Sequence, residues 1–364
     1  DVHMALTFFQ KVERNLIARI PNASDATVNR MTEPRWEVDG QPLDRRAQYM
    51  FRVGRIVERS IPTLTPAAAR RYYARLNRVL EAPPPEIGSV SELSLTLRSG
   101  PRPARAYYPA SSENQDRELP ALVYFHGGGF TIGSIETHDT LCRRICLGAN
   151  CVVISVDYRL APEDRFPAAV EDCDDAYRWV IEHAGELGIR SGRIAVGGDS
   201  AGGNLAAVVS FLARDRGGPL PFAQLLIYPG TGTVEHPGRA KAELQTGYGL
   251  DAQTTRWFFQ NYMGDAVGDD PLAAPLYLGS HVGLPPAIVV TAQFDLLCGE
   301  GIEYAEKLRA AGVPVVHQHV PDLPHGFGTM SVIPRAREAI EDFANALEEA
   351  FRQSSVAPDA TAQK

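Results

Sequence analysis

The sequence predicts an α/β protein in which helices cover both faces of a mostly parallel β-sheet, with a smaller helical cap. Six short apolar runs end in loops of glycine, proline or charged residues, as strands buried on both faces of a parallel sheet do. Amphipathic stretches lie between most of these runs, and such alternation is typical of a parallel sheet covered by helices. The chain has 364 residues, 44% of them apolar, which is enough for one large domain with an addition.

The predicted buried strands, in chain order, are Ala121–Phe125, Cys151–Val156, Ile194–Val196, Phe222–Ile227, Ala287–Thr291 and Val313–Val316. The predicted helices among them are Thr137–Gly148, Pro167–Ala184, Ala201–Arg214, Gly299–Ala311 and Arg335–Arg352. Their apolar residues recur at helical spacing, whereas the strands are nearly continuous in apolar character.

The part of the chain before the sheet is helical in pattern. Apolar residues recur every three to four positions in three stretches, Leu6–Ile20, Pro42–Glu58 and Pro66–Leu80. Thr65 is a good N-cap for the last of these, because proline follows it at the first helical position. Prolines 83–85 form a stiff boundary, after which Val90–Leu97 alternates like a half-exposed antiparallel strand. We therefore predict an N-terminal helical cap segment over residues 1–85.

The remaining chain, residues 86–353, is predicted to be the sheet-bearing catalytic domain. Thr231–Leu284 is too long for a simple crossover, so we expect an insertion there that completes the cap. Its Gln253–Tyr262 stretch is helical and carries four aromatic residues, Trp257, Phe258, Phe259 and Tyr262. These aromatic side chains either line an apolar pocket or form the core of the cap. The small, polar tail over 354–364 is predicted to be disordered.

Composition excludes several classes of protein. The formal net charge is −8 and no basic stripe accompanies stacking aromatics, so we expect no nucleic-acid partner. No apolar run is long enough for a membrane span, and no secretory leader pattern is visible. The five cysteines favour a reduced, cytoplasmic protein over a disulfide scaffold. Cys142 and Cys146 lack a second ligand pair, so we expect no metal site.

A nucleophilic serine is predicted at Ser200. Gly198-Asp199-Ser200-Ala201-Gly202 matches the G-x-S-x-G pattern between a predicted strand and a predicted helix. Small residues let the chain turn sharply there, and the positive end of the helix favours negative charge on the reacting oxygen. A glycine-rich turn that only packs a helix on a strand, or that cradles phosphate, is the alternative for this motif alone.

A second glycine cluster, His126-Gly127-Gly128-Gly129, follows the Ala121–Phe125 strand. Glycines let the backbone approach a ligand with its N–H groups pointing inward, as an oxyanion hole requires. We predict the N–H groups of Gly128, Gly129 and Ala201 as the donors. His126 precedes the serine and is interpreted as a residue that fixes the loop through a bond to the backbone.

The acid and the base are predicted at the ends of the last two strands, where catalytic groups of parallel sheets gather. Asp295 ends an apolar strand and is the predicted acid; Glu300, the nearest rival, is interpreted as a helix cap. His325 follows the last strand and is the predicted base, which takes the Ser200 proton and returns it to the leaving group. His317 and His319 alternate within that strand and are interpreted as structural.

The chain resembles the hormone-sensitive-lipase-like (bacterial family IV) esterases of the α/β-hydrolase superfamily. It carries their H-G-G-G and G-D-S-A-G-G motifs, and three further stretches agree: Asp157–Glu163, Phe166–Ala169 and His325–Phe327. The resemblance implies an eight-stranded sheet with a helical cap, and hydrolysis of short to medium acyl esters without a cofactor. It also implies a buried network of Arg159 and Glu163. After Asp295 the family pattern has proline where this chain has Leu296, which puts the rigidity of that loop in question.

Other functions share this fold. Some family relatives are receptors without the histidine, and His325 argues against that function here. Amidase and acyltransferase activity stay open, because both pass through the same acyl-enzyme. A nucleotide-binding protein is disfavoured, since the glycine loops lack a P-loop lysine and no G-x-G-x-x-G opens a helix near the N-terminus. The predicted ligand is a small acyl ester, and a homodimer is an open possibility.

Overall fold

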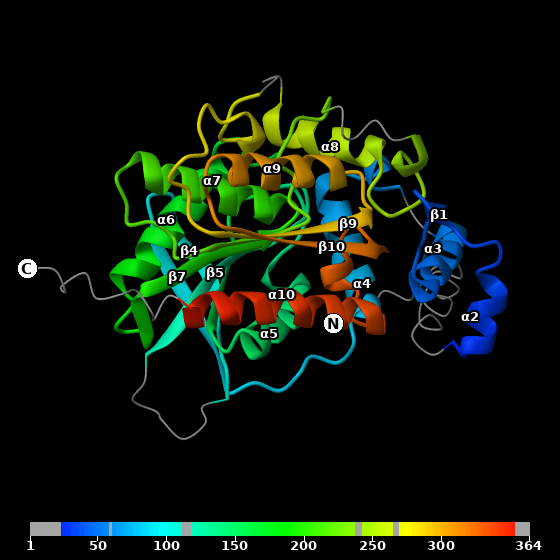
Figure 1. Cartoon of the computed structure of the whole chain (residues 1–364), viewed down its shortest axis with the longest axis horizontal. Coiled ribbons are helices and arrows are strands. Elements are labelled where there is room, and N and C mark those ends of the chain that lie inside the picture. The colour runs from blue at the N-terminus through cyan, green and yellow to red at the C-terminus, as the bar shows by residue number, and fades with distance from the viewer. Residues whose placement is uncertain (1–22, 58–59, 111–117, 237–241, 265–268, 354–364) are drawn as a thin grey trace, which may run out of the picture.

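The computed structural model describes residues 23–57, 60–110, 118–236, 242–264 and 269–353, which form an eight-stranded β-sheet flanked by helices (Figure 1). Its strands are β3 (Ser89–Leu97), β4 (Gly100–Tyr108), β5 (Leu119–Phe125), β6 (Val152–Val156), β7 (Ile189–Asp199), β8 (Gln224–Ile227), β9 (Ala287–Phe294) and β10 (Val315–Pro324). Its helices are α2 (Asp25–Met31), α3 (Arg45–Val57), α4 (Pro66–Leu80), α5 (Asp139–Gly148), α6 (Ala168–Glu182), α7 (Ala201–Asp215), α8 (Ala252–Met263), α9 (Cys298–Ala310) and α10 (Pro334–Gln353).

The strand order across the sheet is β10-β9-β8-β7-β5-β6-β4-β3. Neighbours from β10 to β6 run parallel, whereas β4 is antiparallel to both β6 and β3. The predicted eight-stranded, mostly parallel sheet is therefore confirmed. Parallel strands place their carboxyl ends along one edge of the sheet, and this edge carries the candidate site.

Helices cover both faces of the sheet. In Figure 1, α5 and α10 lie on one face, while α6, α7 and α9 lie on the other. One apolar core fills each interface. The residues of β6 and β8 are buried along their whole length, because both faces of these strands are covered. This two-sided burial is the reason that the predicted strands have few polar positions.

Strand β4 was not predicted, because Pro101 and Pro103 interrupt it in the sequence. Its pairing with β6 begins only at Ala104, so the two prolines lie where β4 has β3 as its one ladder neighbour. Proline lacks an N–H and is tolerated where no ladder bond is needed on that side. The predicted strand at Val90–Leu97 is present and pairs with β4 in antiparallel register.

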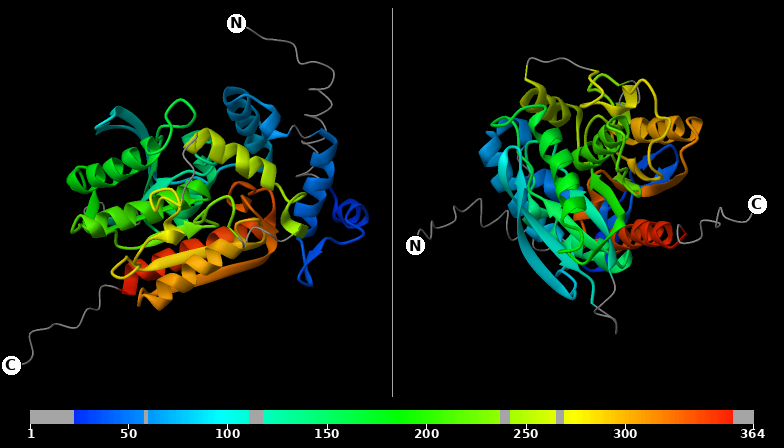
Figure 2. Two further views of the ribbon diagram at one scale, coloured as in Figure 1. Left: turned by 90° about the horizontal axis from the view of Figure 1, so that it is seen from above. Right: turned by 90° about the vertical axis from the view of Figure 1, so that its left-hand side faces the viewer.

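The helices that precede the sheet lie on the same side of the molecule as helix α8 of the insertion. Figure 2 shows the N-terminal helices beside α8 of the insertion, and α8 contacts the short helix η1 (Ile61–Thr63). Helix α4 begins as predicted, with the Thr65 hydroxyl accepting from Ala68 N. Helix α2 and the hairpin of β1 (Glu37–Val38) and β2 (Gln41–Pro42) were not predicted. The helix predicted over Leu6–Ile20 and the tail over 354–364 lie outside the described residues.

Two features of the described residues concern the environment of the protein. All five cysteines are free, as the prediction of a reduced protein requires. Among the residues described above, none of the helices has the length and apolar character needed to span a bilayer. A cytoplasmic location stays a prediction.

Candidate active site

Three side chains from separate loops meet at the carboxyl edge of the sheet. Ser200 follows β7, Asp295 follows β9, and His325 follows β10. His325 Nε2 lies 3.0 Å from Ser200 Oγ, and His325 Nδ1 lies 2.8 Å from Asp295 Oδ2. The structure thus brings the predicted nucleophile, base and acid into one hydrogen-bonded line.

The carboxylate of Asp295 is held from two sides. Its side chain is fully buried, and its second oxygen, Oδ1, accepts from Leu297 N at 2.8 Å. The loop that lacks the family proline is therefore fixed by Asp295 itself. The imidazole of His325 is held as well: the ring of Tyr228 packs edge-on against it, with 4.9 Å between the ring centroids. The imidazole is left with little freedom to turn away from Ser200.

Ser200 occupies a strained backbone conformation at the N-terminus of α7. Its φ is +53° and its ψ is −116°, values that a residue with a side chain rarely adopts. The turn is possible because glycines stand two residues before and two residues after Ser200, at positions 198 and 202. A Cβ on Gly202 would lie 1.8 Å from Phe125 O, so only glycine lets α7 approach β5 this closely.

The loop after β5 brings glycine backbone to the same place. Gly128 has a φ of +119° and Gly129 a φ of +56°, both in the region that favours glycine. Thr131 N and Ile132 N donate to Gly128 O and close the loop into a tight turn. Gly128, Gly129 and Ala201 line the same cavity as Ser200 and His325.

Replacing Gly128 by alanine is expected to lower kcat by about 10²- to 10³-fold, the cost of losing one aligned oxyanion donor. The new Cβ would lie 2.2 Å from Ile132 O, so the peptide must turn away from the cavity. Steady-state kinetics on a p-nitrophenyl ester would measure the change. Gly185→Ala is the matched control, because a Cβ there meets nothing within 4 Å. An unchanged kcat in the Gly128 variant would rule out an oxyanion role for this loop.

Side chains behind the loop hold it in place. His126 Nδ1 donates to Gly127 O at 2.8 Å, which confirms the predicted bond to backbone. Tyr158 donates its hydroxyl to His126 O at 2.6 Å, and Gly127 N donates to Asp199 Oδ1 at 2.8 Å. Burial, together with the nearby His138, lowers the pKa of His126 to about 3, so its ring is neutral. His126 is a loop-fixing residue and lies apart from the Ser200–His325–Asp295 line.

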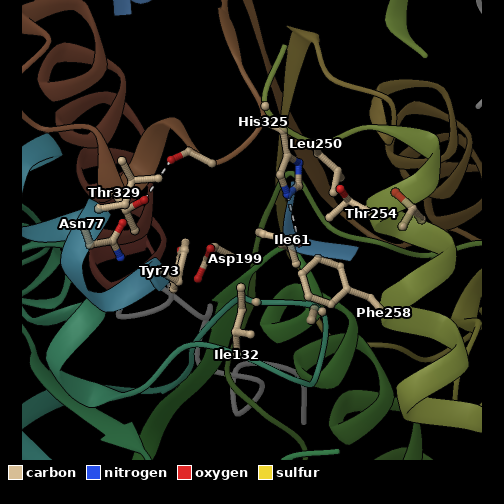
Figure 3. A pocket seen from close by; sticks show the side chains of 18 of the residues that line it. Ile61, Tyr73, Asn77, Ile132, Asp199, Leu250, Thr254, Phe258, His325 and Thr329 are labelled. Carbon is tan, nitrogen blue, oxygen red and sulfur yellow. Dashed lines mark hydrogen bonds between the residues drawn. The ribbon is translucent and has the colours of Figure 1, made fainter. Parts of the chain in front are cut away.

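A mainly apolar cavity of about 220 Å³ opens above Ser200. Figure 3 shows two groups of side chains on its walls, with Tyr73, Asn77 and Thr329 on one side and Leu250, Thr254 and Phe258 on the other. Helices α3 and α4 also contribute apolar residues, among them Met50, Phe51, Leu76 and Leu80. Sequence reasoning did not identify these residues of α3 and α4 as part of the site.

The four aromatic residues of α8 divide between two roles. Within the described part of the chain, the cavity lining takes in Phe258 and Phe259 but leaves out Trp257 and Tyr262. Tyr262 is buried and stacks on Phe130 at 3.8 Å between centroids. Trp257 packs edge-on against Phe258. The pocket-lining interpretation therefore holds for two of the four side chains, and the cap-core interpretation for the others.

Glu300 was predicted wrongly as a helix cap. Its carboxylate is buried, and Oε1 accepts from Thr231 N at 2.7 Å and from Gly232 N at 3.1 Å. Glu300 therefore anchors the start of the insertion to α9. The sequence could not indicate this, because the two partners lie almost seventy residues upstream of the carboxylate.

The expected network of Arg159 and Glu163 is also wrong in its pairing. Arg159 binds the buried carboxylate of Asp172, with Nε 3.0 Å from Oδ2. Glu163 is half exposed and pairs with Arg70 of α4 at 2.6 Å. Arg70 also donates from Nε to Thr131 O at 2.8 Å, so this arginine fastens α4 to the glycine loop after β5. His317 and His319 are structural as predicted, since Thr291 Oγ1 lies 2.9 and 3.0 Å from them.

Glu81, the C-cap of α4, is a partly buried carboxylate that the sequence did not single out. Burial raises its pKa to about 7, although Thr140 Oγ1 donates to it at 3.1 Å. Because the folded pKa lies above the reference value of 4.5, stability is lost as the pH rises through about 4.5 to 7. Glu81→Gln should therefore leave the free energy of unfolding near pH 4 unchanged and raise it near pH 8 by about 1–3 kcal/mol.

Urea melts at both pH values would measure the effect of Glu81→Gln. The exposed Glu86 offers a matched control, whose change to glutamine should alter neither melt. An equal effect of Glu81→Gln at the two pH values would contradict the raised pKa.

Across the same described ranges, no group of three His, Cys, Asp or Glu side chains is arranged to hold a metal ion.

Comparison with known proteins identifies similar sequences and structures. A family described as having the α/β-hydrolase fold matches residues 122–329. The carboxylic ester hydrolase LipN of Mycobacterium tuberculosis is 43% identical over 301 residues, which cover 80% of this chain and 78% of that protein. The ethyl acetate hydrolase of Pseudomonas putida is 38% identical over 286 residues, which cover 77% and 89%.

Solved structures agree with the sequence comparison. An ester hydrolase from the metagenome of Lake Arreo, in complex with a bipyridine phosphonate derivative, superimposes with a TM-score of 0.79 at 36% identity, covering 84% of this chain and 96% of the other. An esterase of Pyrobaculum calidifontis gives a TM-score of 0.77 at 37% identity, covering 87% and 100%. The similarity to these two structures therefore extends over more than four fifths of the chain.

Proposed function

Because the chain belongs to the hormone-sensitive-lipase-like family of α/β-hydrolase-fold enzymes and is a carboxylic ester hydrolase, we propose that it cleaves esters through Ser200, His325 and Asp295. One observation carries this proposal: the hydrogen-bonded line Asp295–His325–Ser200 ends beside glycine amides at one edge of the sheet. This arrangement supplies a nucleophile, a base and donors for an oxyanion.

His325 Nε2 takes the proton of Ser200 as Oγ attacks the ester carbonyl carbon. The negative charge that develops on the carbonyl oxygen is received by the N–H groups of Gly128, Gly129 and Ala201. His325 then gives its proton to the departing alcohol, which leaves an acyl group on Ser200. Water, deprotonated by the same histidine, hydrolyses this acyl-enzyme and restores the hydroxyl. Asp295 keeps the proton of His325 on Nδ1 and stabilises the imidazolium.

Short to medium acyl chains are the proposed substrates. The cavity is mainly apolar, so each methylene that it buries favours binding by about 0.8 kcal/mol until the space is full. Its volume of about 220 Å³ limits how many methylenes fit. Contact of Phe258 with Gly129 narrows the side toward α8, since a Cβ on that glycine would lie 2.1 Å from the phenyl ring.

A series of p-nitrophenyl esters from acetate to decanoate would test this function. We expect kcat/KM to rise from acetate, reach a maximum at short to medium length and then fall. A p-nitrophenyl phosphonate should inactivate the enzyme with one equivalent, and peptide mapping should locate the adduct on Ser200. Binding of esters without turnover would instead identify a receptor, and an adduct elsewhere would exclude the proposed nucleophile.

Replacing Phe258 by alanine is expected to shift the preferred acyl length upward. The change opens the wall above Gly129, so kcat/KM for the longest acyl chain relative to acetate should increase about tenfold or more. The loss of a buried ring should also lower the free energy of unfolding by about 3–5 kcal/mol. Trp257→Ala is the control, because Trp257 lies outside the cavity lining, and its length profile should match the wild type. An unchanged profile in the Phe258 variant would refute its role in the wall.

We also propose that residues 1–85 and the insertion at 231–284 act together as the cap over the catalytic domain. In support, α4 and α8 both line the cavity, through Tyr73 and Asn77 on one side and Phe258 on the other. A homodimer stays a prediction.

A further inference from the structure

A second histidine–aspartate pair is buried directly behind the nucleophile. His138 is the residue before α5, and Asp199 is the last residue of β7, next to Ser200. His138 Nε2 lies 3.3 Å from Asp199 Oδ1, and their side chains are 0% and 4% exposed. Figure 3 shows Asp199 beside Tyr73 at the cavity that contains Ser200. Neither His138 nor Asp199 takes part in the proposed proton transfers.

The hydrogen bonds around His138 fix where its first proton lies. Thr137 Oγ1 donates its proton to Ser134 O at 2.9 Å and accepts from Ser134 N at 2.9 Å. Its contact with His138 Nδ1, at 2.9 Å, must therefore be one in which Nδ1 donates. The carbonyl of Ser134, 3.3 Å from Nδ1, can likewise only accept. His138 Nδ1 consequently carries a proton.

The second ring nitrogen of His138 faces a carboxylate that already accepts two hydrogen bonds. Tyr124 donates its hydroxyl to Asp199 Oδ1 at 2.6 Å, and Gly127 N donates to the same oxygen at 2.8 Å. These donors stabilise the ionised form of Asp199. His138 Nε2 makes no aligned hydrogen bond to the carboxylate, but an unprotonated Nε2 would place a lone pair 3.3 Å from that oxygen, so Nε2 carries a proton as well. With both nitrogens protonated, His138 is an imidazolium.

The electrostatic surroundings agree with this assignment. Burial raises the pKa of Asp199, but His138, Tyr124 and Gly127 together lower it to about 2. Burial lowers the pKa of His138, and the charge of Asp199 more than offsets this, so the net direction is upward. The other titratable groups that face His138 are Glu81 at the end of α4, whose charge also favours the imidazolium, and His126, whose ring lies 5.5 Å away and is neutral.

Asp199 has two opposite effects on the proposed reaction. Its carboxylate holds Gly127 N and so positions the oxyanion loop, yet a bare negative charge beside Ser200 would oppose the developing oxyanion. We propose that His138 is a positioning residue that acts through Asp199: its buried positive charge neutralises the carboxylate, so that Asp199 can hold the oxyanion loop without destabilising the tetrahedral intermediate. This inference rests on the proposed ester hydrolysis at Ser200.

Charge-compensating variants test the role of His138. His138→Gln keeps a donor toward Asp199 but removes the charge, and should lower kcat for p-nitrophenyl butyrate about 10- to 100-fold with little change in KM. Adding Asp199→Asn to this variant removes the unpaired carboxylate and should restore kcat by about tenfold. A residue with a merely structural role would show additive losses in the double variant. The control is His236→Gln, because the buried His236 pairs with Glu303 and does not line the cavity, and its kcat should be unchanged.

Phosphonate titration of active sites would correct every kcat for the folded fraction. If His138→Gln alone does not fold, the comparison moves to the Asp199→Asn background, where losing His138 should cost little. A kcat for His138→Gln within about threefold of the wild type would overturn the inference, and so would a double variant no faster than His138→Gln. Either result leaves Ser200 labelling and ester turnover intact, whereas failure of the proposed function would abolish both in the wild type.

Discussion

Replacing Ser200 by alanine is expected to lower kcat by about 10⁶-fold, the scale seen when a serine nucleophile is removed from a triad. The oxyanion donors and the cavity remain, so the variant should still bind esters with nearly the wild-type affinity. Single-turnover kinetics on p-nitrophenyl butyrate would measure the residual rate. Ser210→Ala is the matched control, because Ser210 lies on the same helix with its hydroxyl bonded to Ala206 O, and its kcat should be close to the wild type.

Glycine at position 200 should abolish activity and also raise stability. The φ of +53° strains any residue with a Cβ, and glycine relieves that strain. The entropy cost of glycine in the unfolded chain offsets part of the gain, so the free energy of unfolding should rise by about 1 kcal/mol relative to Ser200→Ala. Thermal melts of the two inactive variants would compare them directly. A glycine variant less stable than the alanine variant would show that the elbow is not strained.

The three predicted catalytic side chains and the two predicted glycine donors lie in loops that follow strands. Ser200, Asp295 and His325 could be assigned because each follows a recognisable strand, and chain order restricts their roles. The glycines at 128 and 129 could be assigned because few other residues tolerate a positive φ beside a ligand. These inferences depend on local spacing and on the rule that parallel strands end at one edge of the sheet.

Contacts between distant segments could not be predicted. Arg70 meets the oxyanion loop through the docking of α4, and no periodicity in the sequence encodes how that helix docks. Glu300 appeared to be a helix cap because its partners are far away in the chain. Strand β4 was missed because two prolines look incompatible with a strand until its neighbours are known. The buried pair of His138 and Asp199 joins two elements whose contact exists only in the folded sheet.

Replacing Asp295 by asparagine is expected to lower kcat by about 10⁴-fold, because the proton on the His325 ring then moves from Nδ1 to Nε2. Leu297 N donates to Oδ1 of Asp295, so the amide oxygen of an asparagine must face Leu297 and its NH₂ group must face His325. His325 Nδ1 then has to accept, and the ring proton moves to Nε2. A protonated Nε2 cannot take the proton of Ser200, although every atom lies close to its wild-type position.

The pH dependence of the Asp295→Asn variant separates this tautomer effect from simple damage. Deprotonation of Ser200 by hydroxide does not need His325, so kcat of the variant should keep rising at alkaline pH. Asp270→Asn is the matched control: Asp270 Oδ1 accepts from Leu272 N two residues on, as Asp295 does from Leu297 N, but its side chain is exposed in the insertion. That variant should retain the wild-type kcat. A loss below about tenfold in Asp295→Asn would mean that His325 keeps the correct tautomer without the carboxylate, and the acid of this site would then have to be sought elsewhere.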